Sequence, residues 1–175
     1  EKENRRVRFQ KEGMKVTLGG IAKGYAIDRA CSIISKFDIH SALVNVGGDM
    51  RAIGDRSWKV SVQHPREEDK VLGTVELENE AIVTSGDYRR YFFLGNRRVH
   101  HIINPKTGYP ATSCMSVTVI SDSCMEADAM STGIFTAGPE KGKDLLDSLG
   151  SEGIIISSSD EIVKSGMSDF PIKDI

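Results

Sequence analysis

From residue 42 to residue 84 the chain is a succession of short apolar runs divided by turn residues. The runs are Ala42–Val46, Trp58–Gln63, Val71–Leu77 and Ala81–Thr84, and a β-branched run follows at Ser116–Ile120. Runs of this length, separated by Gly, Asp and Pro, are typical of strands. Because few helical patterns lie between them, we expect these strands to pair in an antiparallel sheet.

Two hairpins are expected besides these strands. Tyr88–Leu94 and Arg97–Ile103 flank a Gly-Asn pair at 95–96, which suits a tight turn because both residues tolerate positive φ. Gly153–Ser157 and Ile162–Ser165 are joined by polar residues and predict a final hairpin.

Helical spacing of apolar residues marks both ends of the chain. A short strand at Met14–Leu18 and a turn at Gly19-Gly20 precede a helical pattern from Ile21 to Phe37. Further helices are expected over Glu126–Ala137 and Glu140–Leu149. The prediction is an α+β fold, a largely antiparallel sheet flanked by helices.

Length and charge limit the remaining possibilities. Residues 1–175 are of ordinary size for one domain, and 23 basic against 25 acidic side chains leave no positive excess to attract nucleic acid. No run approaches the roughly 18 apolar residues of a membrane helix. Cys31, Cys114 and Cys124 lack CxxC spacing, so they predict packing residues and neither a disulfide framework nor a zinc site.

The first stretch with chemical potential runs from Thr17 to Tyr25. Its glycines allow a ligand to approach the backbone, the helix that follows is expected to present free N–H groups, and Lys23 adds a positive charge. These features are compatible with a phosphate cradle. The alternative is a simple tight turn with a solvated lysine.

The second stretch is the helical pattern that contains Asp128 and Thr132. Residues four apart share a helix face, so the carboxylate and the hydroxyl converge where one hard cation can bind. Such oxygen ligands suit Mg²⁺, which binds few protein groups and completes its shell with water and phosphates. The alternative is a helix surface that faces solvent.

The third stretch places His100 and His101 before a loop that contains Pro105, Gly108 and Pro110. A histidine held at a strand end is a candidate for proton transfer. Adjacent strand residues point to opposite faces, so the two histidines are not expected to share one ion. The alternative is that one is packed and the other solvated.

Together these stretches resemble the ApbE family of FAD:protein FMN transferases. Two more stretches in the family's order, Ala42–Asp49 and Thr84–Tyr88, extend the resemblance over nearly the whole chain. The resemblance implies Mg²⁺-dependent transfer of FMN from FAD to a Thr or Ser hydroxyl of an acceptor flavoprotein, with release of AMP. FAD and that acceptor protein are therefore the implied partners.

The resemblance also implies roles for individual residues. The metal ligands would be the Asp128 carboxylate, the Thr132 hydroxyl and the backbone carbonyl of Gly20. Lys23 would face FAD, and Ile102 would touch the flavin nucleotide.

The histidine of the family motif matches His101, which would act as the base, with His100 as the lesser candidate. Thr17, also expected beside FAD, stands where the family commonly has Asp, and Asn104 is a second such replacement. The loss of two carboxylates makes the surroundings of a pyrophosphate less negative.

Family members usually carry a long preceding segment, whereas the first motif here begins by Thr17. We therefore expect a carboxyl-terminal portion that lacks part of the FAD pocket. Two other activities fit the same residues: Mg²⁺-dependent FAD pyrophosphatase, giving FMN and AMP, and a non-catalytic flavin-binding module. The resemblance is compatible with a cell-envelope lipoprotein or a cytoplasmic protein, and the sequence specifies neither the acceptor nor the oligomeric state.

Overall fold

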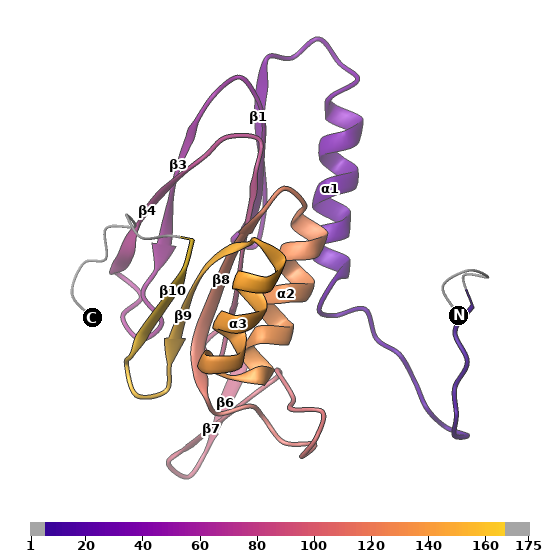
Figure 1. The fold of residues 1–175 in the computed structure, drawn as a ribbon, viewed down its shortest axis with the longest axis vertical. Helices are drawn as coiled ribbons and strands as arrows, with labels where there is room; N and C mark the ends of the chain where they lie inside the picture. The colour runs from indigo at the N-terminus through magenta and orange to yellow at the C-terminus, as the bar shows by residue number, and fades with distance from the viewer. Residues whose placement is uncertain (1–5, 167–175) are drawn as a thin grey trace.

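The computed structural model describes residues 6–166, and a six-stranded antiparallel sheet in the order β1-β2-β5-β8-β9-β10 lies at its centre (Figure 1). The six strands are β1 (Ser41–Val46), β2 (Asp49–Gly54), β5 (Ala81–Gly86), β8 (Cys114–Ser121), β9 (Glu152–Ser157) and β10 (Ile162–Ser165). Every neighbouring pair in this sheet is antiparallel. The predicted fold class is therefore confirmed.

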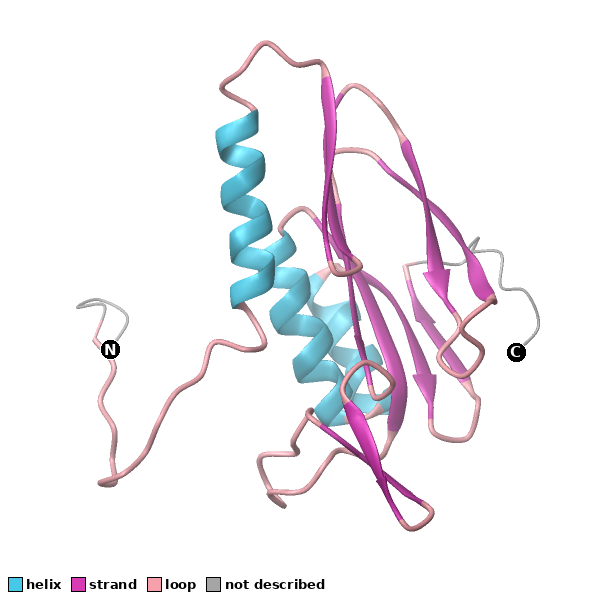
Figure 2. Ribbon diagram, turned by 180° about the vertical axis from the view of Figure 1, so that it is seen from behind, coloured by secondary structure: helices cyan, strands magenta, loops and turns pink. Residues whose placement is uncertain are grey.

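Different elements cover the two faces of the sheet. The helices α1 (Ala22–Ile34), α2 (Cys124–Ala137) and α3 (Pro139–Leu149) all pack on one face, as Figures 1 and 2 show. A ribbon of β3 (Trp58–Gln63) and β4 (Val71–Leu77) covers the other face. The hairpin of β6 (Tyr91–Leu94) and β7 (Arg97–His100) projects beyond one end of the sheet (Figure 2).

Strand alternation produces two hydrophobic cores. Val83 and Val117 point toward the helices and pack with Phe135, whereas Ile82 points to the opposite face and packs with Leu72. Successive side chains in a strand face opposite sides, so β5 and β8 can supply both cores at once. Burial on both faces explains why β8 reads as a continuous apolar and β-branched run.

Most expected elements are present, including both hairpins and the three helices. The strand expected at Met14–Leu18 was wrong, because this segment is exposed and pairs with no strand among the described residues. The strand β2 was not anticipated. Its Asp and Arg residues interrupt the apolar pattern, but it pairs with both β1 and β5. No helix within residues 6–166 is long and apolar enough to cross a membrane.

The carboxylate of Asp28 joins α1 to the amino end of α2. It accepts hydrogen bonds from the backbone N–H groups of Cys124 and Met125, both at 3.0 Å, and from the Ser123 hydroxyl at 2.9 Å. It also pairs with Arg51 of β2. Acceptors at a helix amino end satisfy N–H groups that lack partners within the helix, so Asp28 stabilises the junction of three elements.

We expect Asp28→Ala to lower the free energy of unfolding by about 2–3 kcal/mol, because it removes the cap and leaves Arg51 without its carboxylate. Partial burial raises the pKa of Asp28, but the hydrogen bonds from Met125, Cys124, Ser123 and Arg51 outweigh it, so the pKa lies below its ordinary value. The folded state then holds fewer protons than the unfolded state. The difference in stability between wild type and variant should therefore be full above about pH 4 and shrink below it. Urea denaturation at several pH values measures it, and a difference that is independent of pH would contradict the assignment.

Candidate functional site

Asp128 lies under the amino end of α1. Its side chain is buried, and its Oδ2 accepts a hydrogen bond from the backbone N–H of Gly24 at 2.9 Å. The alternative of a solvent-facing helix surface is therefore wrong for this residue. The helix that carries the carboxylate and the glycine-rich turn, distant in sequence, meet here.

Thr132 lies one turn further along α2 and contacts the same turn. A Cβ atom placed on Gly20 would come within 3.3 Å of the Thr132 hydroxyl oxygen. The hydroxyl of Ser85, near the end of β5, is 3.2 Å from the Thr132 hydroxyl and 2.9 Å from that of Ser131. The structure therefore brings Gly20, Asp128 and Thr132 together, the three residues expected around a metal ion.

Lys23 projects from the first turn of α1 toward the start of β2. Its ammonium group lies 2.6 Å from the Asp49 carboxylate, which is 2% exposed. The backbone turns sharply just before Asp49, where Gly47 and Gly48 both have positive φ. Asp49 is a site residue that the sequence analysis did not single out, although it ends the Ala42–Asp49 stretch.

The amino end of α1 differs from the cradle expected there. The N–H groups of Ile21 and Ala22 both donate to the carbonyl of Leu18, and that of Gly24 donates to Asp128. These three amides are not free to bind phosphate. Positive charge at this turn is therefore provided mainly by the Lys23 side chain.

The electrostatics of the cluster favour a further cation. Burial raises the pKa of Asp49, contacts with Lys23 lower it, and the nearby Asp128 carboxylate raises it again. The net pKa of Asp49 lies above its ordinary value, although the Lys23 ammonium pairs with it. A divalent cation would offset the repulsion between the Asp49 and Asp128 carboxylates.

The available ligands suit one class of metal ion. Within residues 6–166 no three His, Cys, Asp or Glu side chains gather closely enough to hold a metal. One carboxylate, one hydroxyl and a backbone carbonyl are instead oxygen ligands of the kind that Mg²⁺ uses when water and phosphate complete its shell. The space that the missing Cβ of Gly20 leaves beside Thr132 is consistent with this arrangement.

The two histidines have different surroundings. His100 is buried, its Nε2 donates to the Ala111 carbonyl at 2.7 Å, and its ring packs edge-on against Phe135. Its Nδ1 accepts the backbone N–H of Ile102 at 3.3 Å. Both ring nitrogens of His100 are therefore occupied, and the residue holds the loop together.

His101 is exposed and has one weak contact, between its Nδ1 and the Arg90 carbonyl at 3.4 Å. Partial burial lowers the pKa of His101, and the positive charges of Arg90 and Lys23 lower it further, against the opposing effect of the Arg90 carbonyl. The ring is therefore more often neutral near pH 7 than an ordinary histidine, as a proton acceptor requires.

Two other expected site residues, Ile102 and Thr17, lie less favourably, and Asn104 has a structural role. The Ile102 side chain is 5% exposed within the helix-side core, and its N–H and C=O are both hydrogen-bonded, so it is not presented to a ligand in this structure. Thr17 is exposed in the segment before α1. The Asn104 side chain accepts the Lys106 N–H and builds the loop.

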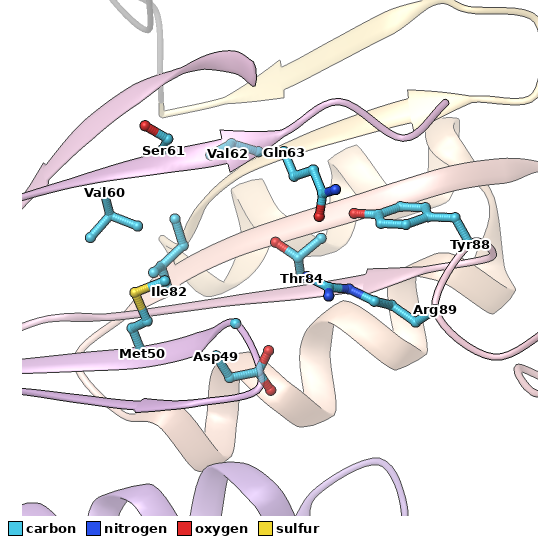
Figure 3. Close-up of a pocket in the computed structure, with 11 residues that line it drawn as sticks. Asp49, Met50, Val60, Ser61, Val62, Gln63, Ile82, Thr84, Tyr88 and Arg89 are labelled. Atoms are coloured by element: carbon cyan, nitrogen blue, oxygen red, sulfur yellow. The ribbon is translucent and has the colours of Figure 1, made fainter. Parts of the chain in front are cut away.

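A cavity of about 140 Å³ lies between β3 and the central sheet, next to Asp49 (Figure 3). Thr84, Tyr88 and Arg89 line it from the end of β5 and the turn that follows. The Thr84–Tyr88 stretch therefore contributes on both faces of the sheet, because Ser85 contacts α2 while its neighbour Thr84 faces this cavity.

Comparisons with known proteins identify relatives of this chain. A profile of the ApbE family matches residues 1–155. A protein of Escherichia coli strain K12 named FAD:protein FMN transferase is 35% identical over 159 residues, which cover 87% of this chain and 45% of the relative. A Klebsiella pneumoniae protein of the same name is 37% identical over 136 residues, covering 77% and 42%.

Solved structures show the same fold. The apbe protein of Thermotoga maritima superposes with a TM-score of 0.83 and 41% identity, covering 89% of this chain and 52% of that one. The flavinyl transferase ApbE of Pseudomonas stutzeri gives 0.72 and 31%, covering 86% and 49%. The chain spans about half the length of these relatives, and by its sequence and its fold it belongs to the ApbE family.

Proposed function

We propose that this chain forms the metal-binding and phosphate-binding part of an FAD:protein FMN transferase. The observation that carries the proposal is the hydrogen bond between Gly24 and Asp128, which brings the α2 carboxylate to the turn that carries Lys23. One pyrophosphate bound at that turn would touch both helices. Two curated relatives named for this activity match most of the chain.

Mg²⁺ would be held by the Asp128 carboxylate, the Thr132 hydroxyl and the Gly20 carbonyl. When bound, it would neutralise charge on the phosphate oxygens during transfer. Lys23 would add a second positive charge, and Asp49, 2.6 Å from its ammonium group, would orient it. Ser85 fixes the Thr132 hydroxyl through its own hydrogen bond.

The proposed reaction joins an acceptor Thr or Ser oxygen to the FMN-side phosphorus of FAD. The new O–P bond forms as the bond from that phosphorus to the bridging oxygen breaks, and AMP leaves with the electron pair. The hydroxyl proton passes to the imidazole of His101, whose lowered pKa keeps it neutral. AMP then carries the charge that the bridging oxygen gains.

Hydrolysis of FAD to FMN and AMP is the second candidate, and one observation favours it. Lys23 and His101 are both exposed, so water can reach the same phosphorus unless an acceptor protein or another part of the protein covers it. The chemistry is otherwise identical, with water in place of the hydroxyl.

One incubation distinguishes the candidates. The chain is mixed with FAD, Mg²⁺ and a Thr-containing acceptor peptide, with the Escherichia coli relative as positive control. The molecular mass of the peptide is then measured, and free FMN and AMP are separated from the reaction mixture. A peptide heavier by one FMN group supports transfer, and free FMN with unmodified peptide supports hydrolysis. If the relative is active and neither product forms with the chain, FAD turnover by this chain is refuted, and the non-catalytic reading replaces it.

We expect His101→Ala to lower turnover by about 100-fold or more while Mg²⁺ affinity changes little, because the residue accepts a proton and binds no metal. The rate of the wild type should rise with pH as the His101 ring loses its proton. It should reach its plateau before the pH has risen to about 6.5, because the pKa of His101 is lowered from that ordinary value. His40→Ala, an exposed histidine ahead of β1, is the control. An unchanged pH profile in His101→Ala would remove it from the mechanism.

A further inference from the structure

A second cavity, of about 350 Å³, lies where β3 ends, beside the β6–β7 hairpin. Its volume is at the lower end of the range for ligand-binding clefts. Its lining includes His64, Arg66, Glu68, Arg89, Tyr91 and Arg98. This cavity shares Gln63, Tyr88 and Arg89 with the one beside Asp49, but none of its lining residues was assigned above to metal binding or proton transfer.

His64 contributes a buried donor. The residue is 5% exposed, and its Nδ1 accepts the backbone N–H groups of Arg66 at 3.1 Å and Glu67 at 3.0 Å. A nitrogen that accepts two hydrogen bonds carries no proton, so the ring proton is on Nε2. Within residues 6–166 this Nε2 has no hydrogen-bond partner. A buried donor without a partner is costly, which makes a ligand acceptor favourable at this position.

Three arginines surround the same space. Asp87 holds Arg66 through two hydrogen bonds, at 2.6 and 2.8 Å, and lies 3.7 Å from Arg98. Its carboxylate, which lies outside the lining, thus pairs with two guanidinium groups, and Glu68 is the acidic residue in the lining itself. Arg89 contacts the Tyr88 ring but forms no ion pair among the residues described. The cavity therefore has an excess of positive charge.

The rings nearby fix the position of two of these groups. Arg98 lies over the ring of Tyr91, 4.2 Å from its centroid, and Arg89 lies 5.7 Å from that of Tyr88. Guanidinium groups held against aromatic rings lose less freedom when they bind a planar or tetrahedral oxyanion. These guanidinium groups line the same cavity as the ring of His64.

We propose that this cavity is an oxyanion-binding subsite, in which a carboxylate or phosphate group accepts from His64 Nε2–H and from Arg89 and Arg98. The group has two conceivable sources, an acidic side chain of a protein partner and the phosphate of a nucleotide. Both present the same charged oxygens. Oxyanion binding stands on these contacts alone and holds whether or not the chain transfers FMN.

The test uses the whole chain, with inorganic phosphate as the probe. Histidine ring signals are followed by NMR during the titration, and the sequence has four histidines, so single variants can assign them. We expect a saturable shift at the His64 ring. Arg89→Gln should weaken phosphate binding about tenfold, the effect of one charge-assisted hydrogen bond. Arg97→Gln makes the same charge change on the exposed hairpin outside the cavity and should have little effect.

The outcomes separate clearly. The absence of a saturable shift at His64, or equal weakening by Arg89→Gln and Arg97→Gln, overturns the proposal. Competition by acetate and by AMP then identifies the source. Stronger displacement of phosphate by acetate indicates a carboxylate partner, and stronger displacement by AMP indicates a nucleotide phosphate. Thermal melts of each variant establish that the fold is intact.

Discussion

Asp128→Asn is expected to reduce Mg²⁺ affinity on the order of 100-fold and to reduce FMN transfer accordingly, while the fold stays intact. Asn has the shape of Asp, and its carbonyl oxygen can still accept the Gly24 N–H. It lacks the negative charge, however, and Mg²⁺ sheds water reluctantly for a neutral oxygen. Asp49 cannot replace it, because the Lys23 ammonium already pairs with that carboxylate.

The measurement is a Mg²⁺ titration of activity together with thermal melts without metal. Wild-type activity of Asp128→Asn at low Mg²⁺ would show that the residue is no ligand. A collapsed melt would show that the charge is needed for folding. Glu126→Gln is the matched control, since it removes a carboxylate from the exposed side of the same helix and should alter neither property.

Gly24→Ala is expected to destabilise the protein by about 3 kcal/mol, the upper part of the usual range for overpacking. A Cβ atom on Gly24 would lie 2.2 Å from the Cys124 carbonyl oxygen and 2.7 Å from the Met125 Cα. These are backbone atoms, so rotation of a side chain cannot relieve the clash. The helices α1 and α2 must separate, and the hydrogen bond from Gly24 to Asp128 lengthens as they do. The melting temperature should fall by roughly 6–12 °C.

Gly133→Ala provides the control for this substitution. Gly133 lies on α2 with nothing within 4 Å of the position of a Cβ. Alanine there should raise stability by up to about 1 kcal/mol through helix propensity alone. Equal melting temperatures for Gly24→Ala and wild type would contradict the close approach of the helices.

The sequence predicted local structure correctly where the spacing of apolar residues and the positions of turn residues indicated the same element. The strand β4 was expected with its observed bounds, Val71–Leu77, and the Gly-Asn pair at 95–96 joins β6 and β7. The predictions failed where pairing with a neighbouring strand decides whether a segment becomes a strand. Met14–Leu18 alternates like a strand yet pairs with nothing in the described residues, whereas polar β2 is a strand because β1 and β5 lie on either side.

The candidate site was anticipated in part. Spacing alone put Asp128 and Thr132 on one helix face, and local chemistry pointed to Lys23 and to the His100–His101 pair. The family resemblance added the Gly20 carbonyl and favoured His101 over His100. Asp49 was missed as a participant, since its role depends on an ion pair with a residue 26 positions earlier. No local pattern reports such a contact.

The sequence by itself determined the order and kind of most elements, because these follow from side-chain periodicity and turn chemistry over a few residues. It also established the family. The tertiary structure decided which chemical groups meet. In the folded protein both ring nitrogens of His100 are hydrogen-bonded, whereas His101 is exposed. The helix α1 packs against α2, so that the backbone N–H of Gly24 donates to Asp128. Long-range contacts of this kind depend on how the helices pack against the sheet, and that packing sums many interactions that no short segment encodes.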